Sequence, residues 1–317
     1  MPTNFVSTAS DSLGGTAGSA GVVQKGYDKA IQFQLRAEPA LRQVVDTRPT
    51  DLTNPGQVVI LQRYVDLTAD TTPLSETVDP DAALMSTPTS VTITLREYGK
   101  SVTKTRALKN FSFKDIDPDV ANIIAQHQLD TLEAVTMNTL KSGTNVIYAG
   151  STATSTATVT AAATIGTANI SRAVAKLRGN KAKGKRGNLF WVGIHPDVSH
   201  DLMLEASSAG WVIPNAYGID QSRIWAGEVG QYKGAFFVES PRLYVATDGA
   251  ASAKVYRTIV AGAQAVAEAV AEEPHTELGT TTDSLNRFRK IGWYGILGQA
   301  VYRDEALFRI ESGSSIA

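Results

Sequence analysis

The stretch from Asp117 to Gly143 constrains this chain more than any other, because it predicts one long helix with a signal at each end. Asp117 is a favoured capping residue, Pro118 suits a first helical turn, and Gly143 follows Lys141 where the helix would stop. Roughly 25 residues at about 1.5 Å each give a rod about 37 Å long, which exceeds the usual globular helix. Such a helix would span a domain as a spine.

The apolar residues of this helix fall on two sides, which predicts two packing partners. The first side holds Val120, Ile124 and Val135, and the second, about a third of a turn away, holds Ala125, Leu129, Leu132 and Leu140. A sheet on one flank and separate segments on the other would bury both. A core helix of an α+β enzyme would show the same pattern, so the helix alone leaves both interpretations open.

The composition bounds the class of protein. With 317 residues, 43% hydrophobic and 19% charged, the chain reads as a soluble folded protein of up to two domains. A net charge of −1 argues against general affinity for nucleic acid, and the absence of cysteine excludes disulfides and thiolate ligands. Since no apolar run could span a bilayer and no signal peptide is apparent, we expect a protein of cytoplasmic origin with no membrane partner.

The N-terminal part reads as an arm and a link. Residues 1–24 carry one charge, Asp11, among Ser, Thr, Gly and Ala, which is too little apolar mass for a core. Residues 24–43 have helical potential, interrupted by Pro39, and 46–56 is turn-rich. The larger apolar residues of the helical stretch are Tyr27, Ile31, Phe33, Leu35 and Leu41.

A long hairpin follows. Residues 57–67 and 90–105 are rich in β-branched residues and read as two long strands. The loop of about twenty residues between them is longer than a compact domain usually tolerates. We expect it to project and to become ordered on another subunit.

Charges of opposite sign occupy two separate segments. No Lys or Arg occurs from Tyr64 to Leu95, and this stretch contains Asp66, Asp70, Glu76, Asp79 and Asp81. No acid occurs between Glu133 and Asp197, and this interval contains a cluster of seven bases: Arg172, Lys176, Arg178, Lys181, Lys183, Lys185 and Arg186. The hypothesis is that these segments pair between neighbouring copies, and ordinary solvated surface is the alternative.

The rest of the chain alternates helix and strand. Residues 167–179 and a segment opening at Pro196 read as helices, and 189–194, 223–225 and 234–239 read as strands. The apolar segment 255–270 and the aromatic-rich segment 292–310 close the chain. We expect the final strand to return to the sheet beside the spine helix.

No constellation of residues predicts catalysis. His195, Asp197, His200 and Asp201 form the closest approach to a metal or acid–base site, but their helical spacing is poor for one and Asp197 suits a helix N-terminus. His127 and Glu133 are placed on different sides of the spine helix and are read as a buried polar contact or surface.

Nucleotide and hydrolase motifs are also missing. The sequence has no phosphate-binding glycine loop and no Gly-x-Ser-x-Gly elbow. We therefore predict no catalytic residue, no cofactor and no metal ligand. An enzyme remains an alternative only if its active site is built from carboxylates that are far apart in the sequence.

The order of these parts resembles the major capsid protein of tailed bacteriophages. The C-terminal region carries most of the resemblance, through Asp283, Gly292, Trp293, Gly298 and Glu311. The strings HPDVSHDLM and GQYKGAFFVESP resemble the middle domain of one such family. The resemblance spans most of residues 25–312.

This resemblance implies an α+β capsid fold with an N-terminal arm, an extended hairpin loop, a spine helix on a peripheral β-sheet domain, and an α/β axial domain. The implied divisions are 1–56 for arm and link, 57–105 for the hairpin, 106–164 with 251–317 for the peripheral domain including the spine helix 118–142, and 165–250 for the axial domain.

The resemblance also implies a function. Hexamers and pentamers of this one chain would form an icosahedral head around double-stranded DNA, which touches the inner surface without sequence preference. The chain would assemble in the host cytoplasm and reside in the virion. Implied partners are a separate scaffolding protein, a portal and, optionally, a decoration protein.

Contacts between subunits are the sites that the sequence suggests. Some relatives join subunits through a hairpin lysine, but 57–99 contains none, so we predict a non-covalent shell. The candidate contact residues are Arg63, Asp70, Glu76, Asp79, Asp81, Arg178, Lys181, Lys183, Lys185 and Arg186. The alternatives are an encapsulin-like compartment shell and, more distantly, a mixed α/β enzyme or adhesin.

Overall fold

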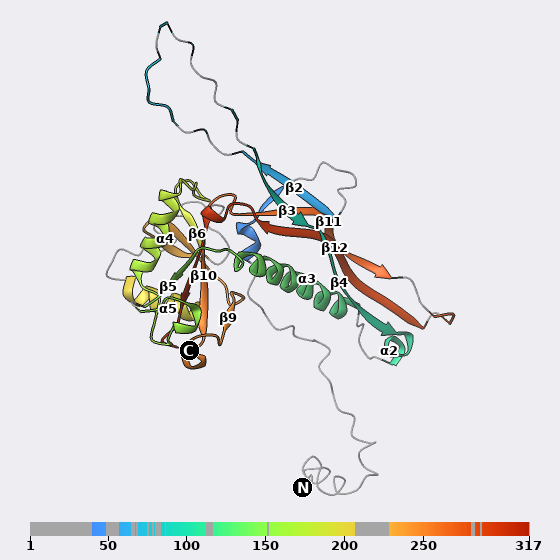
Figure 1. Cartoon of the computed structure of the whole chain (residues 1–317). Helices are drawn as coiled ribbons and strands as arrows, with labels where there is room; N and C mark the ends of the chain where they lie inside the picture. Colours follow the sequence, from blue (N-terminus) through green and yellow to red (C-terminus); the bar gives the residue numbers. More distant parts are fainter. Residues whose placement is uncertain are drawn as a thin grey trace, which may run out of the picture.

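A computed structural model of the chain shows two β-sheet units joined by one long helix, with a hairpin projecting away from both (Figure 1). The structure describes residues 40–48, 57–64, 67, 69–74, 76–77, 79, 84–85, 87–111, 117–150, 152–206, 228–279, 283–285 and 287–316. The expected arm 1–24, the helical stretch up to residue 39 and the expected strand 223–225 lie outside these residues.

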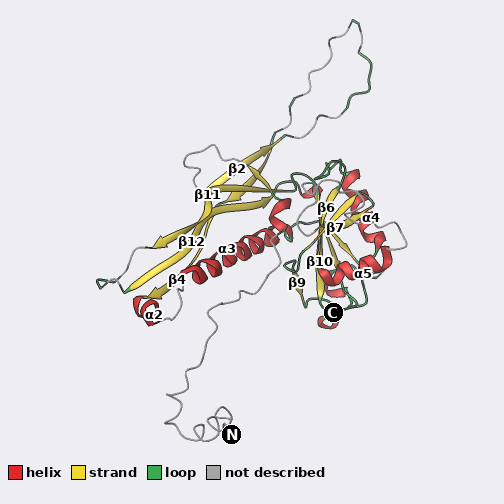
Figure 2. Cartoon of the chain, turned by 180° about the vertical axis from the view of Figure 1, so that it is seen from behind, coloured by secondary structure: helices red, strands yellow, loops and turns green. Residues whose placement is uncertain are grey.

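The long helix α3 runs from Asp117 to Leu140 and spans 24 residues, which confirms the predicted spine. It lies along the sheet formed by β4, β11 and β12, as Figure 2 shows from behind. Its first half buries Val120 and Ile124 against Ile291 and Trp293. Near its end Leu140 enters a different core.

The two packing partners of α3 therefore succeed one another along its axis. This differs from the predicted arrangement of two flanks, because Ala125 and Leu129 are exposed and Val135 is half-buried. The first half of the helix buries side chains against the four-stranded sheet, and its last turns bury side chains in the core of the seven-stranded unit. Helix periodicity alone could not show this change of partner.

The four-stranded sheet has the order β1-β11-β12-β4. Its strands are β1 (Asp46–Arg48), β11 (Val266–Gly279), β12 (Phe288–Val301) and β4 (Arg96–Thr105), and the short helix α2 (Arg106–Phe111) follows β4. β1 runs parallel to β11, and the other pairs are antiparallel. This sheet is the surface on which the first half of α3 rests.

The projecting hairpin consists of β2 (Val58–Arg63) and β3 (Thr89–Thr94), paired from Val58 opposite Thr94 to Arg63 opposite Thr89. The prediction of one strand over 90–105 was wrong in its extent, because the chain divides at Leu95 and continues as β4 in the other sheet. A Cβ at Gly298 of β12 would lie 2.4 Å from the Thr94 carbonyl oxygen. Glycine there lets the end of β3 cross closely over β12.

The larger sheet has seven strands, in the order β5-β13-β10-β6-β8-β7, with β9 paired to β10. They are β5 (Val146–Tyr148), β13 (Leu307–Ser312), β10 (Val255–Ala261), β6 (Phe190–Ile194), β8 (Ala235–Glu239), β7 (Glu228–Tyr232) and β9 (Val245–Ala246). Short 3-10 helices are η1 (Leu41–Val44), η2 (Thr156–Thr158), η4 (Ala250–Ser252) and η5 (Asp304–Ala306).

Both faces of this sheet are covered. Alternate residues such as Phe190 and Val192 pack under the helices α4 (Thr167–Gly179) and α5 (Pro196–Ala206). The opposite face, with Trp191, packs against η1 and the end of α3. Because period-two alternation places successive side chains on opposite faces, the apolar run of β6 fits a strand buried on both sides.

The last strand is not where the sequence analysis placed it. β13 lies between β5 and β10 in the seven-stranded sheet, whereas β12 lies beside the spine helix. The chain crosses from one sheet to the other through η5. The α+β class is confirmed, and no described helix is both long enough and apolar enough to cross a membrane.

Candidate functional site: assembly surfaces

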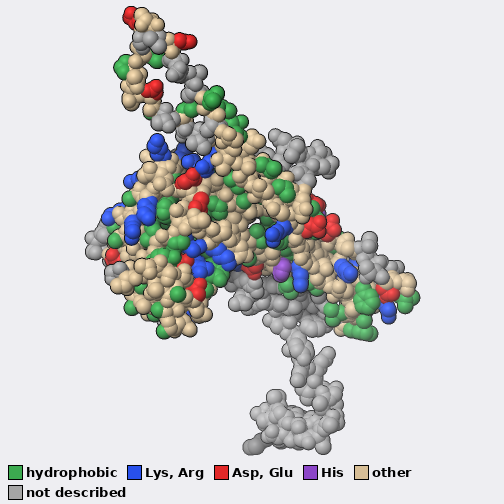
Figure 3. Space-filling model, viewed as in Figure 1, with side chains coloured by type: hydrophobic (Ala, Val, Ile, Leu, Met, Phe, Trp, Pro, Cys, Tyr) green, Lys and Arg blue, Asp and Glu red, His purple; other side chains and the backbone are tan. Residues whose placement is uncertain are grey.

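The loop between β2 and β3 presents acidic and apolar side chains on a segment that stands clear of the body (Figure 3). Asp70, Glu76 and Asp79 are exposed, and Leu84 is 93% exposed. Asp66 and Asp81 belong to the same acidic stretch but lie outside the described residues. We call Asp70, Glu76, Asp79 and Asp81 the acidic tip.

Asp70 shows how the acidic tip is locally arranged. Its Oδ1 accepts the backbone N–H of Thr72 at 2.9 Å, and this bond lowers the pKa of the Asp70 carboxyl. The tip therefore keeps this charge at neutral pH. Exposed apolar side chains beside it, of which Leu74 and Met85 are further examples, are typical of a contact surface.

At the root of the hairpin, Arg63 pairs with Glu305 of η5. The guanidinium donates to both carboxylate oxygens, at 2.7 and 3.0 Å. This bidentate bond lowers the pKa of Glu305. Arg63, predicted as a contact between subunits, thus has a partner in its own chain and joins the root of the hairpin to η5.

The predicted basic segment divides into two groups. Arg178, Lys181 and Lys183 are exposed, and we call these three the basic turn. Lys185 instead donates to Asp46 at 2.7 Å and to the Val44 carbonyl at 2.9 Å.

The guanidinium of Arg186 lies 4.3 Å from the ring centre of Phe236. Such a stacked cation packs against its own chain. Lys185 and Arg186 therefore both have partners within the described chain. Of the five basic residues predicted as contacts in this segment, the three of the basic turn are the exposed ones.

The basic turn lies at the foot of the hairpin. Asn180, inside this turn, donates its side-chain amide to the Glu305 carbonyl at 3.1 Å. Glu305 in turn holds Arg63. Acidic side chains therefore occupy the far end of the projection, and the basic turn lies where the projection leaves the body.

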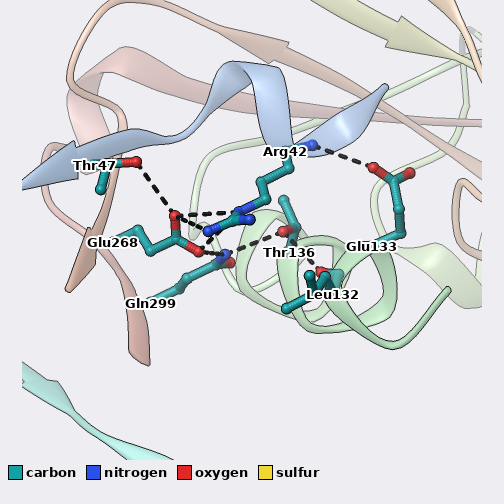
Figure 4. Close-up of polar contacts among 7 residues, drawn as sticks. All are labelled: Arg42, Thr47, Leu132, Glu133, Thr136, Glu268 and Gln299. Atoms are coloured by element: carbon teal, nitrogen blue, oxygen red, sulfur yellow. Dashed lines mark hydrogen bonds and ion pairs between the residues drawn. The ribbon is translucent and has the colours of Figure 1, made fainter. Parts of the chain in front are cut away.

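A buried carboxylate joins the N-terminal segment to the spine and its sheet (Figure 4). Glu268 of β11 is 0% exposed and pairs with Arg42, whose Nη2 lies 3.1 Å from Glu268 Oε2. Thr47 and Gln299 donate to the same carboxylate, at 3.3 and 3.0 Å. Gln299 also reaches Thr136 of α3 at 3.1 Å, so the cluster connects η1, β1, β11, β12 and α3.

Glu133 of α3 fixes the start of η1. Its Oε1 accepts the backbone N–H groups of Leu41 at 2.9 Å and Arg42 at 3.3 Å. Burial raises the pKa of this carboxyl, against the lowering effect of those bonds. Glu133 thus makes a buried polar contact, one of the two expectations for this residue, and its geometry is that of a cap on the N-terminus of η1.

The His195 to Asp201 cluster serves packing between elements. Asp197 accepts the hydroxyl of Tyr256 at 2.7 Å, and burial together with this bond raises the pKa of Tyr256 to about 12. Asp201 accepts the Ser315 backbone N–H at 2.9 Å. Among the described residues, no group of three or more His, Asp or Glu side chains is arranged to hold a metal ion.

Glu311, one of the residues behind the resemblance, lies at the centre of another buried cluster. It is 0% exposed, and Arg257 and Arg309 approach its carboxylate to 3.2 and 2.8 Å. Thr156 donates to it at 2.6 Å. This cluster ties β13 to β10 and to η2.

Sequence reasoning missed Glu268 as an organising residue, although a signal was present. A single acid stands between small apolar residues in VAEAV, and such an acid in a buried strand needs partners. The partner itself was hidden, because Arg42 lies 226 positions away.

A polar cleft of about 830 Å³ opens between the second half of α3 and the crossing of β3 and β4. Hydroxyl and amide groups such as those of Thr92 and Asn138 line it, with the charged residues Arg96 and Asp304. Asp304 already accepts the Thr144 backbone N–H at 3.0 Å. This lining offers hydrogen bonds to a ligand and contains no acid–base pair.

Comparisons with known protein families and solved structures identify what this chain is similar to. A family model described as "Phage capsid protein" matches residues 88–310. The capsid of Ralstonia phage GP4 has a TM-score of 0.77 at 15% identity, covering 92% of this chain and 95% of that one. The cyanophage Pam1 capsid has a TM-score of 0.69 at 16% identity, covering 93% and 97%.

A third solved structure, from Mycobacterium phage Che8, has a TM-score of 0.62 at 15% identity and covers 91% of this chain and 96% of that one. No curated protein matches the sequence. At these identities the solved structures show a shared fold, and the family model reaches most of the chain.

Proposed function

Since the chain belongs to the phage capsid protein family and is a major capsid protein of icosahedral heads, we propose that its acidic tip and basic turn join neighbouring copies. The observation that supports this proposal is that the acidic tip lies at the far end of the projecting hairpin and the basic turn lies at its foot. A contact between two different surfaces of identical molecules runs head to tail, and it closes into a ring when the rotation allows. Hexamers and pentamers are such rings.

Charge and apolar surface would have separate roles in this contact. Exposed ion pairs contribute about 0–1 kcal/mol each, so they set register and partner choice more than affinity. Burying an exposed side chain such as Leu84 or Leu74 contributes about 1.5–3 kcal/mol. The apolar residues of the loop would hold the neighbour that the charges align.

We assign the units of the structure to the domains expected of a capsid subunit. The seven-stranded sheet with α4 and α5 would form the axial domain, so β5, β10 and β13 join residues 165–250 in it. The four-stranded sheet with α3 would form the peripheral domain. The extended hairpin then narrows to about residues 58–94.

The partners beyond the chain itself are proposals of the same kind. A separate scaffolding protein would guide assembly in the host cytoplasm, with a portal at one vertex and, optionally, a decoration protein outside. Packaged DNA would touch the inner surface through phosphates alone. The absence of lysine from 57–99 supports a shell without covalent links through the hairpin.

The other candidate classes are less well supported. An encapsulin-like shell is not favoured by the family match, and enclosed enzyme cargo in place of DNA would identify one. We propose that the chain has no enzymatic activity, in keeping with a structural role.

A charge exchange tests the proposed contact. We expect the triple variant Glu76→Lys, Asp79→Lys, Asp81→Lys to fold but to lose most closed shells in negative-stain images of the chain expressed with its neighbouring genes. The triple variant Arg178→Glu, Lys181→Glu, Lys183→Glu should fail in the same way.

Combining both triple variants in one chain should restore shells, because each altered surface again meets its opposite charge. The matched control is Arg172→Glu, Lys176→Glu, which reverses exposed charge on α4 outside the basic turn. Unchanged shell yield in the first variant, or no recovery in the combined one, would refute the pairing.

A further inference from the structure

The short helix α2 buries none of its residues within its own subunit. It runs for six residues from Arg106 to Phe111, and every one of them is exposed. Its start is held by the hydroxyl of Thr105, which accepts the Leu108 backbone N–H at 3.1 Å, and by the Arg106 N–H, which donates to the Arg287 carbonyl at 2.8 Å. A helix this short is not stable in water without packing. We therefore expect α2 to gain its packing from another molecule.

Apolar side chains gather at this end of the four-stranded sheet (Figure 3). Phe111 is 88% exposed and Leu108 is 50% exposed, and both belong to α2. The turn between β11 and β12 adds Leu278 and Leu285 at the same end of the sheet, and both are exposed. A group of exposed apolar side chains is typical of a contact surface.

α2 also carries positive charge. Its charged residues are Arg106 and Lys109, and it contains no acid. Lys109 already has a contact in its own chain, so the charge that α2 offers to a partner is that of Arg106. A surface that receives α2 should therefore combine apolar area with carboxylates.

The four-stranded sheet itself has a face with these properties. β12 directs Ile291 and Trp293 toward α3, so Gly292 and Tyr294 lie on the opposite face, because successive residues of a strand alternate. The strands β4 and β11 place their paired residues on that same side. We call this side of the sheet the open face, and its residues are Glu97, Gly99, Ser101, Glu272, His275, Glu277, Lys290, Gly292 and Tyr294.

Tyr294 is the apolar centre of the open face. It is half-buried and lies directly opposite Gly99, which has no side chain to cover the ring. Desolvation and, after it, the charges of Glu97, Glu272 and Glu277 raise the pKa of the Tyr294 hydroxyl. The ring is therefore surrounded by carboxylates from both neighbouring strands.

The open face also carries two basic groups. His275 Nε2 lies 3.8 Å from Glu272 and 3.4 Å from Glu277, and Lys290 lies in the row of the sheet nearer to α2. The three carboxylates outnumber these two groups even when the histidine is protonated. The open face is therefore negative, and it is complementary to α2 in charge.

We propose that α2 of one copy docks on the open face of a neighbouring copy. Phe111 and Leu108 pack against Tyr294, and Arg106 lies among the carboxylates around that ring. Two α2 helices facing each other would instead bring like charges together. Because two different surfaces of the same chain meet, the contact runs head to tail. It adds to the hairpin contact proposed above and does not depend on it.

Engineered cysteines test this contact, since the chain has none of its own. Chains with Leu108→Cys are assembled together with an equal amount of chains with Ser101→Cys, and the closed shells are treated with a short bis-maleimide. Half of the neighbours are then of the right kind, so we expect more than about a quarter of the chains to appear as linked dimers. The matched control replaces Ser101→Cys by Ala175→Cys, which is exposed on α4, and should give less than a tenth of that yield.

The pattern of links identifies the partner surface. Linked dimers in shells made only of Leu108→Cys chains would show that two α2 helices meet, and would overturn the proposal. Closed shells that give no more dimer from the mixture than from the control would overturn it as well. That result would leave the hairpin contact standing, because the shells would still have formed.

A second measurement needs no cross-link. The variant Leu108→Asp, Phe111→Asp should shift the midpoint of subunit unfolding by less than about 3 °C, because α2 is exposed in the isolated subunit. It should nevertheless lower the yield of closed shells at least about tenfold. The matched control Leu204→Asp, at an exposed leucine of α5, should keep the yield within about twofold. An unchanged yield in the α2 variant, or a much less stable subunit, would contradict docking between copies.

Discussion

Replacing Arg42 by Met would leave the Glu268 carboxylate buried without its cation. Removing one partner of a fully buried ion pair costs about 3–5 kcal/mol, because the other charge stays desolvated. The Arg42 side chain is 35% exposed while that of Glu268 is 1% exposed, so water can reach the site from one side. We therefore expect Arg42→Met to lower the free energy of unfolding by about 2–3 kcal/mol.

The assay is thermal unfolding of unassembled subunits followed by circular dichroism. One kcal/mol lowers the midpoint of a domain of this size by about 2–4 °C, so a loss of about 2–3 kcal/mol should lower it by roughly 4–12 °C. As a control, Arg287→Met removes the pair of Arg287 with Asp283, whose Arg287 side chain is 58% exposed. That change should cost less than about 1 kcal/mol.

The double variant Arg42→Met, Glu268→Met separates a lost charge pair from lost packing. Because it removes the buried charge together with its partner, it should be more stable than Arg42→Met alone by at least about 1 kcal/mol. A double variant as unstable as the sum of the single variants would refute the reasoning, since it would show that the two side chains contribute independently.

Three further predictions follow from other contacts. Burial raises the pKa of Glu133 in the folded chain above its unfolded value of about 4.3, so this carboxyl destabilises the fold as pH rises above the unfolded value. Glu133→Gln should therefore gain stability relative to wild type as pH rises above about 4, measured by urea unfolding, and a pH-independent difference would contradict this. Arg63→Ala should change subunit stability by less than about 1 kcal/mol yet reduce the yield of closed shells, because the Arg63–Glu305 pair orients the hairpin; normal shells would exclude that role. Gly298→Val should make the chain near Leu95 sensitive to limited proteolysis, since its Cβ would lie 2.4 Å from the Thr94 carbonyl, and unchanged cleavage kinetics would count against the close crossing.

The parts of the fold that local chemistry specifies could be predicted from the sequence. The spine helix begins at Asp117 as its capping signals indicate, and the projecting loop follows from the long interval between two β-rich stretches. The opposite charges of the loop and the basic segment could be read directly from the residue types in each stretch. These features depend on residues close together in the chain.

The features that the sequence did not reveal depend on distant partners. Alternation predicts a strand over 90–105, but only β12 determines that β4 leaves the hairpin at Leu95. The buried pattern of β13 fits either sheet, and its neighbours β5 and β10 decide which one it joins. Likewise, the sequence shows Lys185 only as one base in a basic run, and its ion pair with the distant Asp46 is visible only in the structure.

An electron cryo-microscopy reconstruction of the assembled shell tests the central claim most directly. We predict closed particles in which the hairpin loop of each subunit lies on its neighbour, with the carboxylates of Glu76 and Asp79 within about 4 Å of Lys181 or Lys183, a normal ion-pair distance. Closed particles in which the acidic tip instead contacts another part of the neighbour, or no subunit at all, would contradict the account.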